Sequence, residues 1–143
     1  MKKIITLLTI AILFAFSCTT RLPRNKINVV DNLNRKQGLW ITSDTSSKIN
    51  VLSYKNGDTN GKYYSYHSNG QIAIYGRYLH GNKQGKWYYY HINGQVVAYG
   101  KYFKDKKQGI WRRYSSSGLL GSIITYKQDS IVNRVVITYN APW

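Results

Sequence analysis

Aromatic and aliphatic residues alternate with polar ones over most of the chain, and the whole pattern returns after 24 positions. Recurring glycines and tyrosines mark this period, at Gly61, Gly85 and Gly109 and at Tyr54, Tyr78, Tyr102 and Tyr126. Alternation of period two is typical of β-strands, and a fixed period of this length is typical of an array of equal supersecondary units. The pattern therefore predicts a stack of small β-hairpins.

Residues 85–108, GKWYYYHINGQVVAYGKYFKDKKQ, show one unit most clearly. Residues 87–91 are aromatic and β-prone, residues 95–103 resume a strand, and residues 104–108 turn the chain into the next unit. The Asn-Gly pair between the strands predicts a tight turn, because both residues tolerate positive φ. The predicted turn residues of the array are Asn69, Gly70, Asn93, Gly94 and Gly118. Loops this short join only neighbours, so we expect an all-β fold, an elongated and twisted antiparallel meander of successive hairpins.

Side chains alternate across a strand, which sorts the repeated columns by face. The aromatic column Trp40, Tyr63, Trp87 and Trp111 lies three residues from the column Tyr66, Tyr90 and Tyr114, so the two predicted ladders lie on opposite faces. On the second strand of each unit, the set that begins with Ile72 is expected in the core, and the set that begins with Ala73 is expected to be half exposed. Gly76 and Gly100 are expected where an aromatic ring crosses the backbone.

The N-terminal segment predicts export. Two lysines precede an apolar stretch over residues 4–16 that is too short to span a bilayer, so residues 1–17 are interpreted as a signal peptide. Cys18, the only cysteine, follows in the context Ala-Phe-Ser-Cys, which resembles the lipobox of bacterial lipoproteins, although that family prefers Leu and a small residue at the first two positions. An ordinary signal peptide or an uncleaved anchor are the alternatives to lipidation.

Three parts follow from this organisation: the signal peptide (1–17), the lipidated cysteine with a tether (18–34), and the repeat domain (35–143). The repeat domain comprises four hairpin units and a C-terminal capping strand, expected over residues 135–139, with Trp143 covering the open end of the core. The expected location is a bacterial membrane, at its periplasmic or outer-membrane face, with the lipid as anchor.

Charge is strongly unbalanced, at +16 for the whole chain. Loss of Lys2 and Lys3 with the signal leaves +14, against five aspartates and no glutamate. Such a charge indicates an anionic partner or surface, and export favours lipid head groups, envelope polysaccharide or an acidic protein over nucleic acid. The alternative is that the lysines only keep an aromatic sheet soluble and discourage edge pairing.

Catalytic and metal-binding constellations are not evident in the sequence. No two titratable residues form a recognisable acid–base pair, so we predict a non-enzymatic protein without cofactors. His67 and His91 occupy equivalent columns and are expected to be neighbours across the sheet, but the next unit has Ser115 in that column. An interfacial aromatic column explains them better than a metal site does.

The units GKYYSYHSNGQIAIYGRYLHGNKQ and GKWYYYHINGQVVAYGKYFKDKKQ resemble the bacterial variant of the MORN repeat (membrane occupation and recognition nexus). The shared features are Gly-Lys-aromatic, a central Tyr, Asn-Gly, and a Tyr before the next loop, over about 95 residues. The resemblance implies an elongated sheet of hairpins. Many exported bacterial members carry the label of a toxin–antitoxin antitoxin component, and eukaryotic relatives are linked to membranes, phospholipids and protein scaffolding.

Two functions fit these observations: an envelope-tethered scaffold that binds an anionic partner, and an antitoxin or immunity protein that neutralises one cognate toxin by direct binding. A purely structural spacer is a minor third possibility. Aromatic rings beside cations suit sugar rings, phosphates or an acidic protein surface. The candidate binding residues are Tyr75, Tyr99, Arg77 and Lys101 on one face, with Lys83, Lys86, Lys104, Lys106, Lys107, Arg112 and Arg113 around the loops.

Replacing the single cysteine tests the anchor. Cys18→Ser removes the thiol that would carry the lipid, so the protein is expected to move from the membrane fraction to the soluble envelope fraction. The measurement is fractionation followed by a salt wash, with the parent chain as the control. Membrane association that survives both the substitution and the wash would contradict lipidation.

Overall fold

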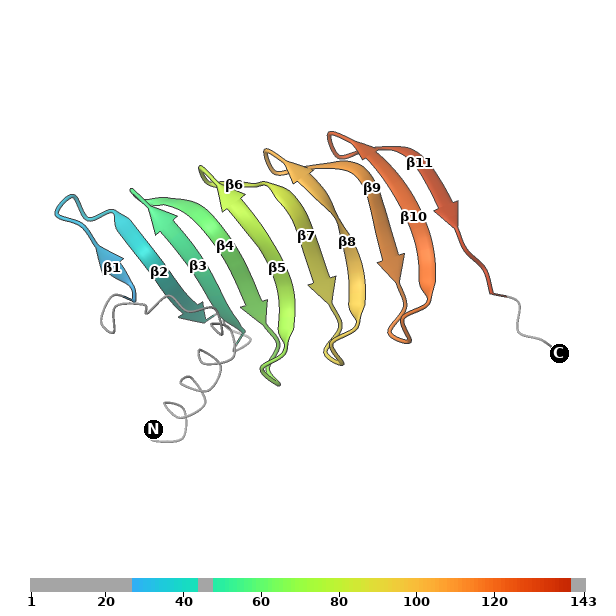
Figure 1. Ribbon diagram of the computed structural model, residues 1–143, viewed down its shortest axis with the longest axis horizontal. Coiled ribbons are helices and arrows are strands. Elements are labelled where there is room, and N and C mark those ends of the chain that lie inside the picture. The colour runs from blue at the N-terminus through green and yellow to red at the C-terminus, as the bar shows by residue number, and fades with distance from the viewer. Residues whose placement is uncertain (1–26, 44–47, 140–143) are drawn as a thin grey trace, which may run out of the picture.

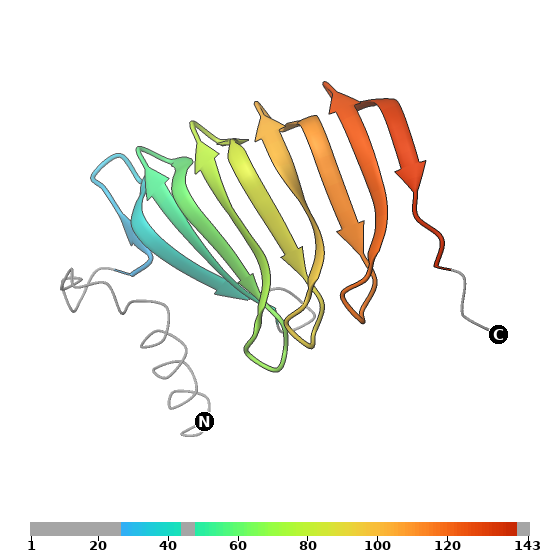
Figure 2. The same ribbon diagram turned by 45° about the vertical axis from the view of Figure 1, so that its right-hand side comes forward.

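A computed structural model describes residues 27–43 and 48–139. This part of the chain forms one antiparallel sheet of eleven strands in chain order, except that β5 pairs with both β6 and β7 (Figure 1). The strands are β1 (Val29–Val30), β2 (Lys36–Ser43), β3 (Ile49–Lys55), β4 (Asp58–Tyr66), β5 (Ile72–Leu79), β6 (Asn82–Lys83), β7 (Gly85–Tyr90), β8 (Val96–Phe103), β9 (Lys106–Tyr114), β10 (Leu120–Lys127) and β11 (Ser130–Val136). The predicted all-β meander is confirmed, and the strands form a single layer in both views (Figure 2).

The sheet begins earlier than predicted. Val29 and Val30 pair with Gln37 and Lys36, so a strand and its turn occupy the last residues of the stretch predicted as a tether. The final strand likewise lies at Ser130–Val136, five residues before the expected start. The predicted signal peptide, Cys18 and Trp143 lie outside the described residues.

A row of large and small side chains crosses one face of the sheet, which we call the tryptophan face. Register pairs place Leu52 beside Tyr63 and Tyr63 beside Gly76, and further along the row Trp87 lies beside Gly100 and Trp111 beside Ile124. Trp87 and Ile124 are each only 1% exposed. The core of this single-layer sheet therefore lies along this row and the small buried residues beside it, such as Ala98 and Ser65.

Each buried tryptophan lies over a glycine of the preceding repeat. A Cβ added at Gly76 would overlap the ring of Trp87, and one added at Gly100 would overlap the ring of Trp111. The predicted close approach of ring to backbone is therefore confirmed. Tyrosines then pack edge-on against the tryptophans: the ring centroid of Trp87 is 5.2 Å from that of Tyr78 and 5.7 Å from that of Tyr102. Such pairs contribute about 0.5–1.5 kcal/mol beyond their buried area.

The loops around Asn69 and Asn93 differ from the prediction. Gly70 has φ +84°, but Asn69 has no positive φ, and the N–H of Gly70 donates to the carbonyl of His67 while the N–H of His67 donates to that of Gln71. This is a three-residue loop, a type I turn followed by a left-handed glycine, rather than a two-residue turn. The side chain of Asn69 also donates to the carbonyl of Ile92, 2.9 Å away in the next loop.

The two-residue turns lie instead at the opposite edge of the sheet. Both central residues have positive φ in His80-Gly81, in Gln128-Asp129 and in Lys104-Asp105, where the predicted loop had extended to residue 108. Non-glycine residues adopt this conformation at a cost, so the surrounding contacts must hold it. Asp105 Oδ1 accepts a 2.7 Å hydrogen bond from the N–H of Lys83 in the preceding repeat, and Asp129 accepts one from Lys107.

A recurring Lys-Gln-Gly triplet, at residues 36–38, 83–85 and 107–109, provides the matching groups. The glutamine of each triplet accepts a hydrogen bond from the backbone of the following turn: Gln37 from Asn56, Gln84 from Lys104, and Gln108 from Gln128. Each triplet therefore attaches its repeat to the next one at the turn edge.

Bulges change which second-strand residues are buried. The register shifts between Ser65 and Tyr66, so Ile72 pairs with Tyr66 and the extra residue is Ala73. Ile72 was expected in the core but is 37% exposed, and Ala73 was expected to be half exposed but is only 7% exposed. The alternation of side chains breaks at a bulge, and a simple period of two misses this.

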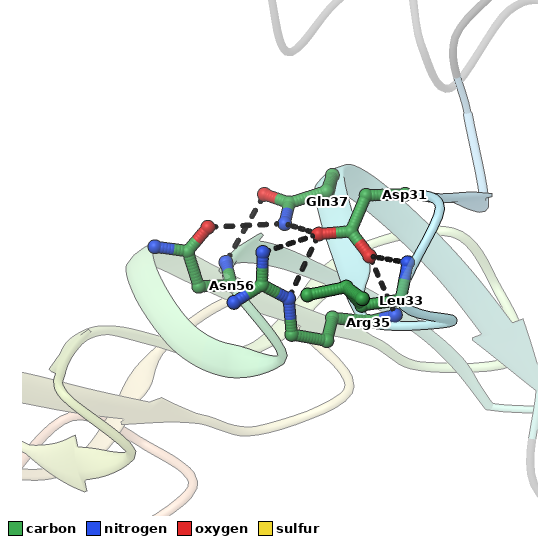
Figure 3. A network of polar contacts seen from close by, with 5 residues as sticks. All are labelled: Asp31, Leu33, Arg35, Gln37 and Asn56. Carbon is green, nitrogen blue, oxygen red and sulfur yellow. Dashed lines mark hydrogen bonds and ion pairs between the residues drawn. The ribbon is translucent and has the colours of Figure 1, made fainter.

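Asp31 organises the turn that opens the sheet (Figure 3). Its Oδ1 accepts hydrogen bonds from the backbone N–H groups of Leu33 and Arg35, and its Oδ2 accepts from Arg35 Nε and Gln37 Nε2, both at 2.9 Å. The backbone N–H and the guanidinium of Arg35 hold the pKa of Asp31 well below its usual value of 3.8. Gln37 in turn contacts Asn56 of the next turn, which links the first hairpin to the array.

Filling the glycine beneath a tryptophan should destabilise the array. Gly100→Ala places a methyl group in the ring of Trp111, and overpacking of this kind costs about 1–3 kcal/mol. The measurement is the thermal midpoint. Gly121→Ala is the matched control, because its nearest neighbour would be a carbonyl oxygen at 3.7 Å and no positive φ is involved. Equal midpoints for the two variants would show that the ring does not depend on the glycine.

Acid should remove the contribution of Asp31. A carboxyl whose pKa is lowered in the folded state stabilises the fold at any pH above its pKa in the unfolded chain. This stabilisation is lost progressively as the pH falls below 3.8. Asp31→Asn should therefore lower the thermal midpoint at neutral pH, and the difference from the parent should shrink on acidification. A difference that stays constant from neutral pH down through that range would argue against an ionised Asp31.

Candidate functional site

The face opposite the tryptophan row, which we call the tyrosine face, carries a continuous row of rings. Register pairs join Tyr64 to Tyr75, Tyr75 to Tyr88, and Tyr88 to Tyr99, one ring on each of four neighbouring strands. The centroids of these pairs lie 5.1, 6.2 and 5.7 Å apart. The guanidinium of Arg112 lies 5.8 Å from the centroid of Tyr99 and ends the aromatic row with a cation–π contact.

A second set of tyrosines supports this row from one side. Tyr66, Tyr90 and Tyr114 lie near Tyr64, Tyr88 and Tyr99, with ring planes inclined by only 15–21°. Burial is the main cause that raises the pKa of each of these three hydroxyls above 10.0. They therefore remain neutral at physiological pH, and the positive charge of the face comes from other residues.

Four exposed cations run beside the tyrosine row, and we call them the cation row. Lys62 lies directly opposite Arg77, and Lys86 lies directly opposite Lys101. Arg77 and Lys86 are brought together across β5 and β7, where both line the same hollow. All four side chains are exposed to solvent.

The hollow has a volume of about 340 Å³ and lies at the centre of the tyrosine face. Its walls are the side chains of Tyr75, Tyr88, Arg77 and Lys86, together with Gln84, and two glycines, Gly76 and Gly85, complete it. Gly85 has φ +73°, and it lies where the strand is interrupted between β6 and β7. Two aromatic rings and two cations therefore surround one open depression.

Carboxylates lie elsewhere within residues 27–43 and 48–139. Asp31 pairs with Arg35, whereas Asp105 and Asp129 accept backbone hydrogen bonds at the turn edge. Asp58 begins β4 at the same edge, opposite Lys55. No carboxylate in this part of the chain forms an ion pair with the cation row, so its charge is available to a ligand.

The predicted binding residues divide between the two faces. Tyr75, Tyr99, Arg77, Lys101 and Arg112 lie together on the tyrosine face. Arg113 pairs with Ala98 on the tryptophan face, whereas Lys106 pairs with Phe103 at the turn edge of the tyrosine face.

Two predicted lysines have a different environment. Lys83 Nζ lies 4.8 Å from the ring centroid of Trp87 and 5.0 Å from that of Tyr102, and Lys107 takes the same position over Trp111 and Tyr126. Lys36 repeats the arrangement over Trp40. These lysines are cation–π partners of the core row and belong to the tryptophan face.

Sequence reasoning omitted Lys62, Tyr64 and Tyr88 from the site. All three belong to the recurring Gly-Lys-aromatic segments, and alternation from the tryptophan column would have placed them on the opposite face. What the sequence could not supply is the interruption of the strand at Gly85, beside which Arg77 and Lys86 line one hollow.

The histidines contribute to loop packing. His67 Nε2 lies 3.0 Å from the carbonyl oxygen of Tyr90, whereas His91 Nε2 is buried without a hydrogen-bond partner. No three residues among the histidines, cysteines and acids of the described segments lie close enough together to hold a metal ion. None of the segments described here forms a helix that is long and apolar enough to cross a bilayer.

Comparisons with known proteins give little further information. No protein-family model matches the chain, and no curated protein does. Among solved structures, a variant of TarM from S. aureus, in complex with fondaparinux, α-GlcNAc-glycerol and UDP, aligns with 84% of this chain at 13% identity and a TM-score of 0.26. The chain spans 22% of the length of that structure, and a similarity of this size carries no functional information.

Proposed function

We propose that this protein is a non-enzymatic binding module of the bacterial MORN type, exported and held to the envelope by a lipid on Cys18. Its tyrosine face binds an anionic partner. The resemblance of the repeats, the apolar N-terminal segment and the charge of +16 support this assignment. An extended repeat surface without a recognisable acid–base pair favours binding over catalysis.

The observation that carries the proposal is the pairing of like charges in the cation row. Like charges directly opposite each other destabilise a sheet, yet Lys62 faces Arg77 and Lys86 faces Lys101. No carboxylate within the described segments compensates them. An anionic ligand would relieve this repulsion, and the adjacent tyrosine rings offer it an aromatic surface.

Neutralising the centre of the face should weaken binding beyond the effect of net charge. Arg77→Gln/Lys86→Gln should lower the affinity for immobilised polygalacturonate, for polyphosphate or for micelles containing phosphatidylglycerol by about tenfold, since each exposed charge contact contributes up to about 1 kcal/mol. The full chain in detergent is used, at low and moderate salt.

Lys127→Gln/Arg134→Gln is the matched control, because it removes the same charge from exposed positions at the last turn and on the tryptophan face. If both double variants lost affinity for the anionic probes equally, only net charge would matter, and the tyrosine face would not be the binding surface. Stoichiometric capture of one acidic toxin through the same residues would indicate the antitoxin function.

A further inference from the structure

The four cations of the tyrosine face form a line rather than a patch. They lie on β4, β5, β7 and β8, one on each strand, and the line therefore runs across the strands. Neighbouring strands lie about 4.7–4.9 Å apart, so one positive charge is presented at each strand spacing.

The line has two defined ends. Beyond β8, Lys101 lies opposite Gln108, and the pair in the next repeat is Ile110 with Thr125, which is uncharged. Before β4, the uncharged Ser53 of β3 lies at a register shift, next to the Leu52–Tyr63 pair. The cation row is therefore limited to four charges.

Over β4, β5 and β7 the line is one residue wide. On one side it borders the tyrosine row, and on the other side the next outward residue of β5 is Leu79, which is exposed. At β8 the next outward residue is Phe103, and two further lysines lie beside it: Lys104 Nζ is 5.7 Å from its ring centroid, and Lys106 is its partner on β9. An elongated ligand follows charges that run in one direction across the strands better than a globular acidic protein does. A planar lipid surface would follow it poorly, because an antiparallel sheet of this kind twists along its length.

We infer that the partner is a linear anionic polysaccharide, lying across the strands with its acid groups on the cation row and its sugar rings beside the tyrosines. This inference rests on the proposed function and names its ligand class. A sugar unit is about as long as one strand spacing, so a chain with one carboxylate per sugar matches the row. Tyrosine side chains supply both apolar ring surface and hydroxyls, which sugar rings need for recognition.

Oligogalacturonates of increasing length test this geometry, because they carry one carboxylate per sugar. The dimer spans only the hollow, whereas the hexamer covers the whole row. Calorimetry with the full chain in detergent should show affinity that rises with length up to about four sugars and then levels off. The uncharged maltohexaose is the neutral control and should not bind.

Single variants locate the ligand on the row. Lys62→Gln and Lys101→Gln, at its two ends, should each weaken hexamer binding about threefold and leave dimer binding unchanged. Lys86→Gln, in the hollow, should weaken the binding of both. Lys86→Gln also removes one member of a like-charge pair and should not lower the thermal midpoint. The charge-conserving Lys86→Arg should restore binding.

Several outcomes would overturn the inference while leaving the proposed function intact. Equal affinity for dimer and hexamer would exclude a row-length ligand. If polyphosphate of matched charge bound as tightly as the hexamer, the site would recognise charge alone. If phosphatidylglycerol micelles bound and the hexamer did not, the ligand would be a lipid. Failure of every anionic probe to bind the face would instead remove the proposed function itself.

Discussion

The packing of a tryptophan ring onto the backbone of the preceding repeat is the contact on which the rest of the fold depends. A single-layer sheet has no second layer to bury its apolar residues, so its core must be made within one face. Gly76 and Gly100 make room for Trp87 and Trp111, and tyrosines and lysines then enclose the rings. The other face of the sheet is therefore not needed for the core, and the rings and charges that it carries are available for binding.

Contacts at the two edges keep successive repeats in register. At one edge, aspartate and glutamine side chains bridge the turns at Lys104-Asp105 and Gln128-Asp129 to the preceding Lys-Gln-Gly triplets. At the other edge, Asn69 and Asn93 reach the backbone of the following loop. Because neighbours are fixed at both ends and in the middle, side chains on the tyrosine face align into straight rows. The alignment of charges follows from repetition of the backbone.

The sequence was sufficient for the period, the meander and the assignment of the two aromatic columns to opposite faces, because these depend only on alternation and short loops. It was not sufficient for the turns. Nothing local suggests that Lys104 adopts a positive φ, since the groups that hold it come from Gln84 and Lys83, some 20 residues earlier. The bulge near Ile72 and Ala73 also changes which of these two side chains is buried. The binding site was predicted only in part, because Lys83 and Lys86 were grouped as loop cations, whereas they lie three residues apart and therefore on opposite faces, Lys83 over Trp87 and Lys86 in the hollow.

The position that holds glycine in the two middle repeats holds Ile124 in the last one, where it is almost completely buried. A further repeat of the same kind would need its tryptophan to lie at this point, and the isoleucine side chain already fills that space. Adding a further unit of the middle type after this strand would therefore require the residue at this position to become small again.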